Sequence, residues 1–127
     1  IATLYANFCN SAGVGAGGTN WVTNQSSQSN PFTATPSQSN ATVTFAQWPN
    51  NSGNAYPLQT DIYVTNPNQN KKKTFTGSGM YIQASYYNNP NAFNFFDTFL
   101  GTTSYPGLIW TSSGAGISFS YNVYAWD

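Results

Sequence analysis

The chain has 127 residues, of which 5% are charged and 17% are aromatic, and its net charge is zero. Glu, Arg and His are absent, whereas soluble proteins commonly carry about a quarter of charged residues. A nucleic-acid interface needs clustered basic residues, and acid–base catalysis depends mainly on His or paired carboxylates. We therefore expect no nucleic-acid partner and no enzyme. The length predicts a single domain over residues 1–127.

The cysteine and the three aspartates are scattered along the sequence, and they predict no metal site and no cofactor. Cys9 is the single cysteine, and Asp61, Asp97 and Asp127 lie far apart in the sequence. We expect Cys9 to be a buried, inert thiol and the Lys71–Lys73 run to be solvated. Asp97 lies among Phe residues, which predicts a hydrogen-bonded carboxyl in a packed region. So few titrating groups predict a melting temperature that is nearly flat from about pH 3 to about pH 8.

Apolar and polar residues alternate along most of the chain, which is the period of a β-strand. The predicted strands cover residues 4–8, 41–46, 61–65, 80–87, 93–100, 108–111 and 117–126. Polar segments rich in Asn, Gly and Pro separate them, notably 24–40, and no amphipathic helix or membrane span is indicated. The pattern predicts an all-β fold, an antiparallel β-sandwich of the Ig-like or jelly-roll type with about seven to eight strands.

The N-terminal segment has the features of a strand that can leave its own sheet. Its apolar side chains are Ile1, Leu4, Ala6 and Phe8, and the Gly-rich segment 11–19 behind it is a candidate flexible hinge. An uncharged surface and strands without charged gatekeepers favour association. Residues 1–9 are thus a candidate donor strand that completes the sheet of a second copy. The alternative is that they form the first strand of their own sandwich.

Aromatic residues near predicted loops and strand ends support an alternative function, a carbohydrate-binding module or lectin. Aromatic faces stack on sugar rings, and Asn or Gln amides bind their hydroxyl groups. The candidate ligand or interface aromatics are Trp21, Trp48, Tyr86, Tyr87, Phe93, Trp110 and Trp126. The competing interpretation is that these rings fill or cover the core.

Three N-x-S/T sequons, at Asn24, Asn40 and Asn50, are candidate glycosylation sites. A chain that opens with Ile1 is typical of a mature product after removal of a signal peptide, although a trimmed chain opens in the same way. The strand-like N-terminus, the Gly-rich hinge and the charge-poor sandwich resemble secreted filament or pilin-type subunits of microbial cell surfaces, in particular archaeal thread-like filaments. That resemblance implies donor-strand exchange and heavy glycosylation. We expect a non-catalytic extracellular subunit that assembles with copies of itself into a filament, pilus or surface coat.

Overall fold

The structure, a computed structural model, describes residues 2–27, 32, 36–48, 59–82, 90–114 and 120–125. These residues form nine β-strands and no helix, so the all-β prediction is confirmed. The strands are β1 (Ala2–Cys9), β2 (Trp21–Thr23), β3 (Gln25–Ser27), β4 (Ser37–Asn40), β5 (Val43–Trp48), β6 (Thr60–Thr65), β7 (Lys73–Ile82), β8 (Pro90–Phe99) and β9 (Gly107–Ser112). Accordingly, no helix in the described part of the chain has the length and apolarity to cross a membrane.

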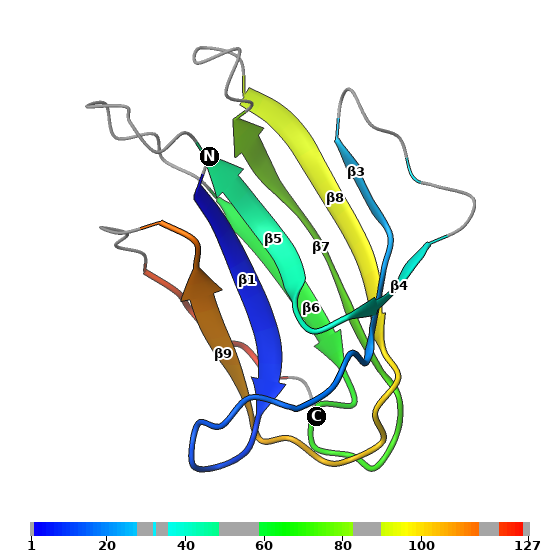
Figure 1. Cartoon of the computed structure of the whole chain (residues 1–127). Helices are drawn as coiled ribbons and strands as arrows, with labels where there is room; N and C mark the ends of the chain where they lie inside the picture. Colours follow the sequence, from blue (N-terminus) through cyan, green and yellow to red (C-terminus); the bar gives the residue numbers. More distant parts are fainter. Residues whose placement is uncertain are drawn as a thin grey trace.

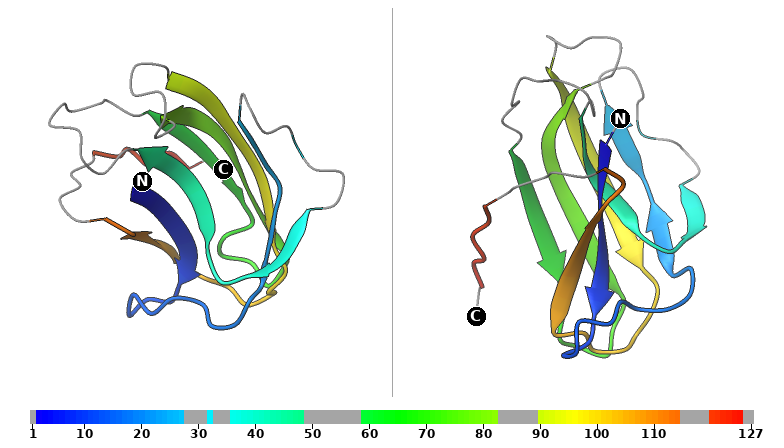
Figure 2. Two further views of the ribbon diagram at one scale, coloured as in Figure 1. Left: turned by 45° about the horizontal axis from the view of Figure 1, so that its top comes forward. Right: turned by 60° about the vertical axis from the view of Figure 1, so that its left-hand side comes forward.

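The strands form a β-sandwich whose two layers face each other (Figure 1). They are hydrogen-bonded in the order β4-β2-β8-β7-β5-β1-β9, with β3 also paired to β8 and β6 to β7. One layer contains β9, β1 and β5, and the other contains β6, β7, β8 and the β2–β3 segment (Figure 2). All pairs are antiparallel except the β5–β7 contact, where Gln47 lies opposite Tyr81 in parallel.

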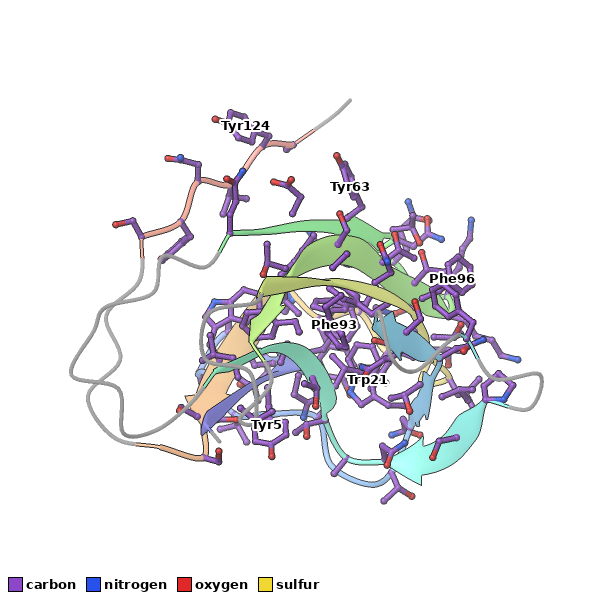
Figure 3. The ribbon with its side chains drawn as sticks, turned by 90° about the horizontal axis from the view of Figure 1, so that it is seen from above. Tyr5, Trp21, Tyr63, Phe93, Phe96 and Tyr124 are labelled. Atoms are coloured by element: carbon purple, nitrogen blue, oxygen red, sulfur yellow. The ribbon has the colours of Figure 1, made fainter. Side chains whose placement is uncertain are left out.

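The core between the layers is mainly aromatic. Its buried residues are Leu4, Ala6, Phe8, Trp21, Val43, Phe45, Phe75, Phe93, Phe95 and Phe99. Strand alternation produces this core directly: in β6, Ile62 and Val64 are half-buried while Asp61, Tyr63 and Thr65 are exposed. Seen from above, Trp21 and Phe93 lie between the two layers, whereas Tyr63 points outward (Figure 3).

Strands also occur where the sequence predicted none. The polar segment 24–40 includes β3 and β4, and β7 begins at Lys73, seven residues before the predicted strand. Gly77 lies within this unpredicted part of β7, although glycine is uncommon inside strands. In the structure a Cβ at Gly77 would collide with the carbonyl oxygen of Asp61 and with the ring of Phe95. Glycine is therefore required here for the close approach of β6, β7 and β8.

The predicted C-terminal strand is wrong for residues 120–125. These residues lie outside every strand, and Val123 and Tyr124 are each 81% exposed. Alternation marks a segment that is able to form a strand, but a strand forms only where an edge pairs with it. Residues 115–119 and 126 lie outside the described residues, as do residues 83–87 of another predicted strand.

Candidate functional site

Strand β1, the predicted donor, is an inner strand of its own chain. It pairs with β5 through residues such as Ala6, opposite Val43, and with β9 from Leu4, opposite Ser112, to Cys9, opposite Gly107. Leu4, Ala6 and Phe8 are buried in the core, and Ile1 lies outside the described residues. This arrangement corresponds to the alternative reading, in which residues 1–9 complete their own sandwich. Exchange of β1 between copies stays a prediction.

The second half of β1 makes the most specific contacts. The Phe8 ring stacks on Trp21, with 5.3 Å between ring centres and an interplanar angle of 6°, and meets Phe99 edge-on at 5.1 Å. The adjacent Asn7 accepts a hydrogen bond from Trp21 Nε1 at 3.1 Å and donates one from Nδ2 to the carbonyl oxygen of Ala16 at 3.0 Å. Both faces of β1 are therefore anchored at this end.

The predicted hinge 11–19 contains hydrogen-bonded turns in this structure. Asn10 Oδ1 accepts hydrogen bonds from the backbone N–H groups of Ala12 and Val14, each at 3.0 Å. The N–H of Ala16 donates to the carbonyl oxygen of Phe8 at 2.7 Å, which folds the segment back onto β1. Gly13 and Gly18 have positive φ angles of 74° and 79°, a conformation that glycine adopts without strain. If β1 left the sheet, the hydrogen bonds of these turns would be lost together with its pairing to β5 and β9.

Unlike β1, which pairs on both sides, strand β9 pairs on one side among the described residues, and the segment 120–125 lies outside every strand. Tyr121, Val123 and Tyr124 are 69%, 81% and 81% exposed. Among the described residues β9 pairs with β1 alone, so its other edge carries no strand. Leu108 and Trp110 of β9 are half-buried against the core. The right-hand view of Figure 2 shows the C-terminal segment lying apart from the ribbon of β9.

Lys73 is buried, so the expectation that the whole Lys71–Lys73 run is solvated is wrong at this residue. Its exposed fraction is 0%, whereas Lys71 and Lys72 are exposed. The Nζ atom donates to three backbone carbonyl oxygens, those of Gln69 at 3.0 Å, Lys71 at 2.8 Å and Thr103 at 2.8 Å. Desolvation lowers the pKa of the Lys73 ammonium. All three ammonium hydrogens have acceptors, which makes this buried charge tolerable.

Asp97 is a buried carboxyl on β8, and the prediction that it is hydrogen-bonded within a packed region is confirmed. Its Oδ1 accepts the backbone N–H of Asn24 at 2.9 Å, and its Oδ2 accepts Gln25 Nε2 at 3.4 Å. Gln25 Nε2 also donates to the carbonyl oxygen of Thr44 at 2.9 Å, which links β3 to β5 in the opposite layer. Desolvation outweighs these hydrogen bonds and raises the pKa of Asp97 to about 7.

The predicted ligand-binding aromatics are not gathered on one surface of the described residues. Trp21 is 0% exposed and Phe93 is 7% exposed, so both are core residues and the prediction is wrong for these two. Trp110 is half-buried and packs edge-on against Phe45 at 5.0 Å. Trp48 ends β5, where the structure describes its backbone, and Tyr86, Tyr87 and Trp126 lie outside the described residues.

Asn24 and Asn40 are both half-buried, but the surroundings of their side-chain atoms differ. The Oδ1 atom of Asn24 is buried without a hydrogen-bond partner, and the backbone N–H of the same residue is bound to Asp97. Asn40 is half-buried at the end of β4, where its Nδ2 donates to Thr23 Oγ1 at 3.1 Å. Asn50 lies outside the described residues. Of the two described sequons, Asn40 is thus the better placed for a glycan.

Cys9 is buried and free, as predicted. Within the part of the chain that the structure describes, no three His, Cys, Asp or Glu residues lie close enough together to hold a metal ion. In comparisons with protein-family models, curated proteins and solved structures, the chain matched none. The argument for a function therefore depends on the chain's own strands and exposed side chains.

Proposed function

We propose that this protein is a non-catalytic extracellular structural subunit that assembles with copies of itself by β-strand addition. The observation that carries the proposal is the segment 120–125, which has the alternation of a strand but lies outside every strand of the described residues, with Val123 and Tyr124 each 81% exposed. A segment that has strand alternation and exposed apolar side chains, in a chain whose sheet has an unpaired edge, favours pairing with another chain.

The C-terminal segment is a better donor than β1 on energetic grounds. Withdrawing β1 would break its ladders with β5 and β9 and expose Leu4 and Phe8, whose burial contributes about 1.5–3 kcal/mol each. Only replacement by an identical strand from a neighbour would offset that loss. Donation of residues 120–125 breaks no strand pairing, because the segment lies outside every strand.

The acceptor that we propose is the outer edge of β9. This strand contains no charged residue, whereas β6, another edge strand, carries the exposed Asp61. The uncharged edge strands β3 and β4 have three and four residues, against six in β9. A charge on an edge strand discourages pairing with a second chain. An added strand would also cover Leu108 and Trp110, which are half-buried against the core. Main-chain hydrogen bonds would supply the affinity, and these apolar side chains would select the register.

An extracellular location is part of the proposal. With a net charge of zero, little electrostatic repulsion opposes association of the chains. Such a surface suits a protein whose working state is a polymer or a glycan-coated chain. The half-buried Asn40 sequon lies at the end of β4, and β4 is at the opposite end of the strand order from β9. A glycan on Asn40 would therefore not block the addition of a strand to β9.

Sedimentation velocity of the purified chain, with matched variants of the donor segment, tests this proposal. Val123→Lys places a charge on one face of the segment, and Asn122→Lys places the same charge one residue away on the other face. We expect the wild type to form large assemblies, Val123→Lys to lower the fraction assembled at least tenfold, and Asn122→Lys to have a smaller effect. A wild type that stays monomeric at every concentration, or a Val123→Lys variant that assembles like the wild type, would contradict the proposed mode of assembly.

A further inference from the structure

The carboxyl group of Asp97 lies inside the sandwich without a compensating charge. The residue is 0% exposed and occupies an inward position of β8 between Phe95 and Phe99. It accepts one short hydrogen bond, from the backbone N–H of Asn24 at 2.9 Å, and one long one, from Gln25 Nε2 at 3.4 Å. An ionised carboxylate has room for about four such bonds, so its ionised form is poorly satisfied here.

The strands packed against β8 offer no cation to Asp97. Strands β2, β3 and β5 contain no ionisable residue, and β7 contains Lys73 and Tyr81. The Nζ of Lys73 donates to the carbonyl oxygens of Gln69, Lys71 and Thr103, and no ion pair with Asp97 occurs among the described residues. Tyr81 lies opposite Asn91, near the other end of β8.

A second unsatisfied group lies on the residue that Asp97 contacts. Asn24 Oδ1 is buried and has no hydrogen-bond partner, although the backbone N–H of the same residue donates to Asp97. A buried acceptor without a donor is costly. A neutral carboxyl group carries one O–H donor, whereas the carboxylate carries none. One proton on Asp97 would therefore remove a buried charge and add one O–H donor to this part of the core.

We propose that Asp97 is a proton-binding site built into the fold, occupied in the folded chain and empty in the unfolded chain at mildly acidic pH, so that acid strengthens the sandwich. Loss of this proton places an unpaired carboxylate between the layers, beside the Gln25 side chain that links β3 to Thr44 of β5. The site thus makes the stability of the fold sensitive to the pH of the surrounding medium.

The direction of the effect follows from the pKa of Asp97, which burial raises from an ordinary 3.8 to about 7. Between these two values the folded chain binds a proton that the unfolded chain releases. The contribution is fully present below 3.8 and is lost as the pH rises through about 7. Within that window the ratio of folded to unfolded chain falls by up to about tenfold for each pH unit of increase.

Urea unfolding of the full chain at several pH values between 4 and 8 (roughly the window that linkage defines) tests this proposal. Asp97→Asn is the central variant, because its amide is permanently neutral and supplies a donor in place of the protonated carboxyl. We expect the folded ratio of the wild type to rise by at least tenfold on acidification and that of Asp97→Asn to be nearly constant. Asp61→Asn, at an exposed position of β6, removes the same charge and is expected to keep the wild-type slope.

Equal pH slopes for the wild type and Asp97→Asn, or a wild type that loses stability in acid, would overturn the proposal. Should Asp97→Asn fail to fold, infrared spectroscopy of the wild type decides the question. The band of a protonated carboxyl group is expected in the folded protein at pH 6 (about one unit below the raised pKa) and should vanish on unfolding at the same pH. A folded protein with no such band would also overturn the proposal.

Discussion

The ammonium nitrogen of Lys73 lies 5.8 Å from the centre of the Phe8 ring and joins a loop at one end of the sandwich to the anchored end of β1. The same nitrogen lies 6.0 Å from the Phe99 ring and 5.7 Å from the Tyr105 ring. Its three hydrogen bonds reach the carbonyl oxygens of Gln69, Lys71 and Thr103. One buried cation thereby connects the turn between β6 and β7 with the segment between β8 and β9.

Replacement of this cation is expected to weaken the fold strongly. Lys73→Met keeps the length and apolar volume of the side chain but leaves three carbonyl oxygens without their donor. We predict a loss of about 2–4 kcal/mol in the free energy of unfolding, measured by urea titration. Lys72→Met, at the exposed neighbouring position, is the control and should change stability by no more than about 0.5 kcal/mol. Equal effects of the two substitutions would show that the buried cation contributes nothing special.

Two Phe→Ala changes separate the core from the surface. Phe8 is 0% exposed and contacts Trp21, Phe99 and Tyr105, whereas Phe96 is 57% exposed on β8. Phe8→Ala is expected to lower the free energy of unfolding by about 3–5 kcal/mol, and Phe96→Ala by about 0.5 kcal/mol. Unfolding followed at two protein concentrations would separate any contribution from association. A Phe8→Ala variant as stable as Phe96→Ala would mean that β1 is not part of the folded core.

Much of the fold follows from strand alternation in the sequence, as β6 illustrates with Ile62 and Val64 facing the core. Prediction failed where glycine or polar residues occupy strand positions for reasons that arise only in three dimensions. Gly77 is needed because neighbouring strands approach it closely, and β3 and β4 are polar strands in a segment interrupted by Pro31 and Pro36. The C-terminal alternation caused the opposite error, a strand predicted where none forms, because no described edge strand pairs with residues 120–125.

Of the two charged residues that are buried in the described part of the chain, Asp97 was predicted correctly and Lys73 was not. Asp97 lies among Phe95, Phe96 and Phe99, and these neighbours predicted a hydrogen-bonded carboxyl in a packed region. Lys73 and Phe75 are two residues apart and alternate with Thr74 and Thr76, a pattern that is consistent with a buried Lys73. The run of three adjacent lysines led instead to the prediction that Lys73 is exposed to solvent. The raised pKa of Asp97 also replaces the expectation of pH-independent stability, since composition counts ionisable groups without showing their surroundings.

The two described sequons are expected to respond differently when the chain is secreted by a host that attaches N-linked glycans. Asn40→Gln should remove one glycan mass, because Asn40 ends β4 and the hydrogen bond from its Nδ2 to Ser37 Oγ is exposed. Asn24→Gln should leave the glycan mass unchanged but reduce stability, because the amide oxygen of Asn24 is buried and a longer side chain has to be accommodated there. Mass spectrometry of the intact variants measures the first effect, and urea titration the second. A glycan found on Asn24 would refute this assignment.

Electron microscopy of the protein as isolated, without refolding, tests the central claim most directly. If the chain is a structural subunit joined by strand addition, the images will show ordered polymers, and the Val123→Lys variant will show dispersed particles of single-chain size. An excess of a synthetic peptide with the sequence of residues 117–125 should likewise stop polymer growth by occupying the outer edge of β9. Dispersed particles from the wild-type protein at every concentration would contradict the account.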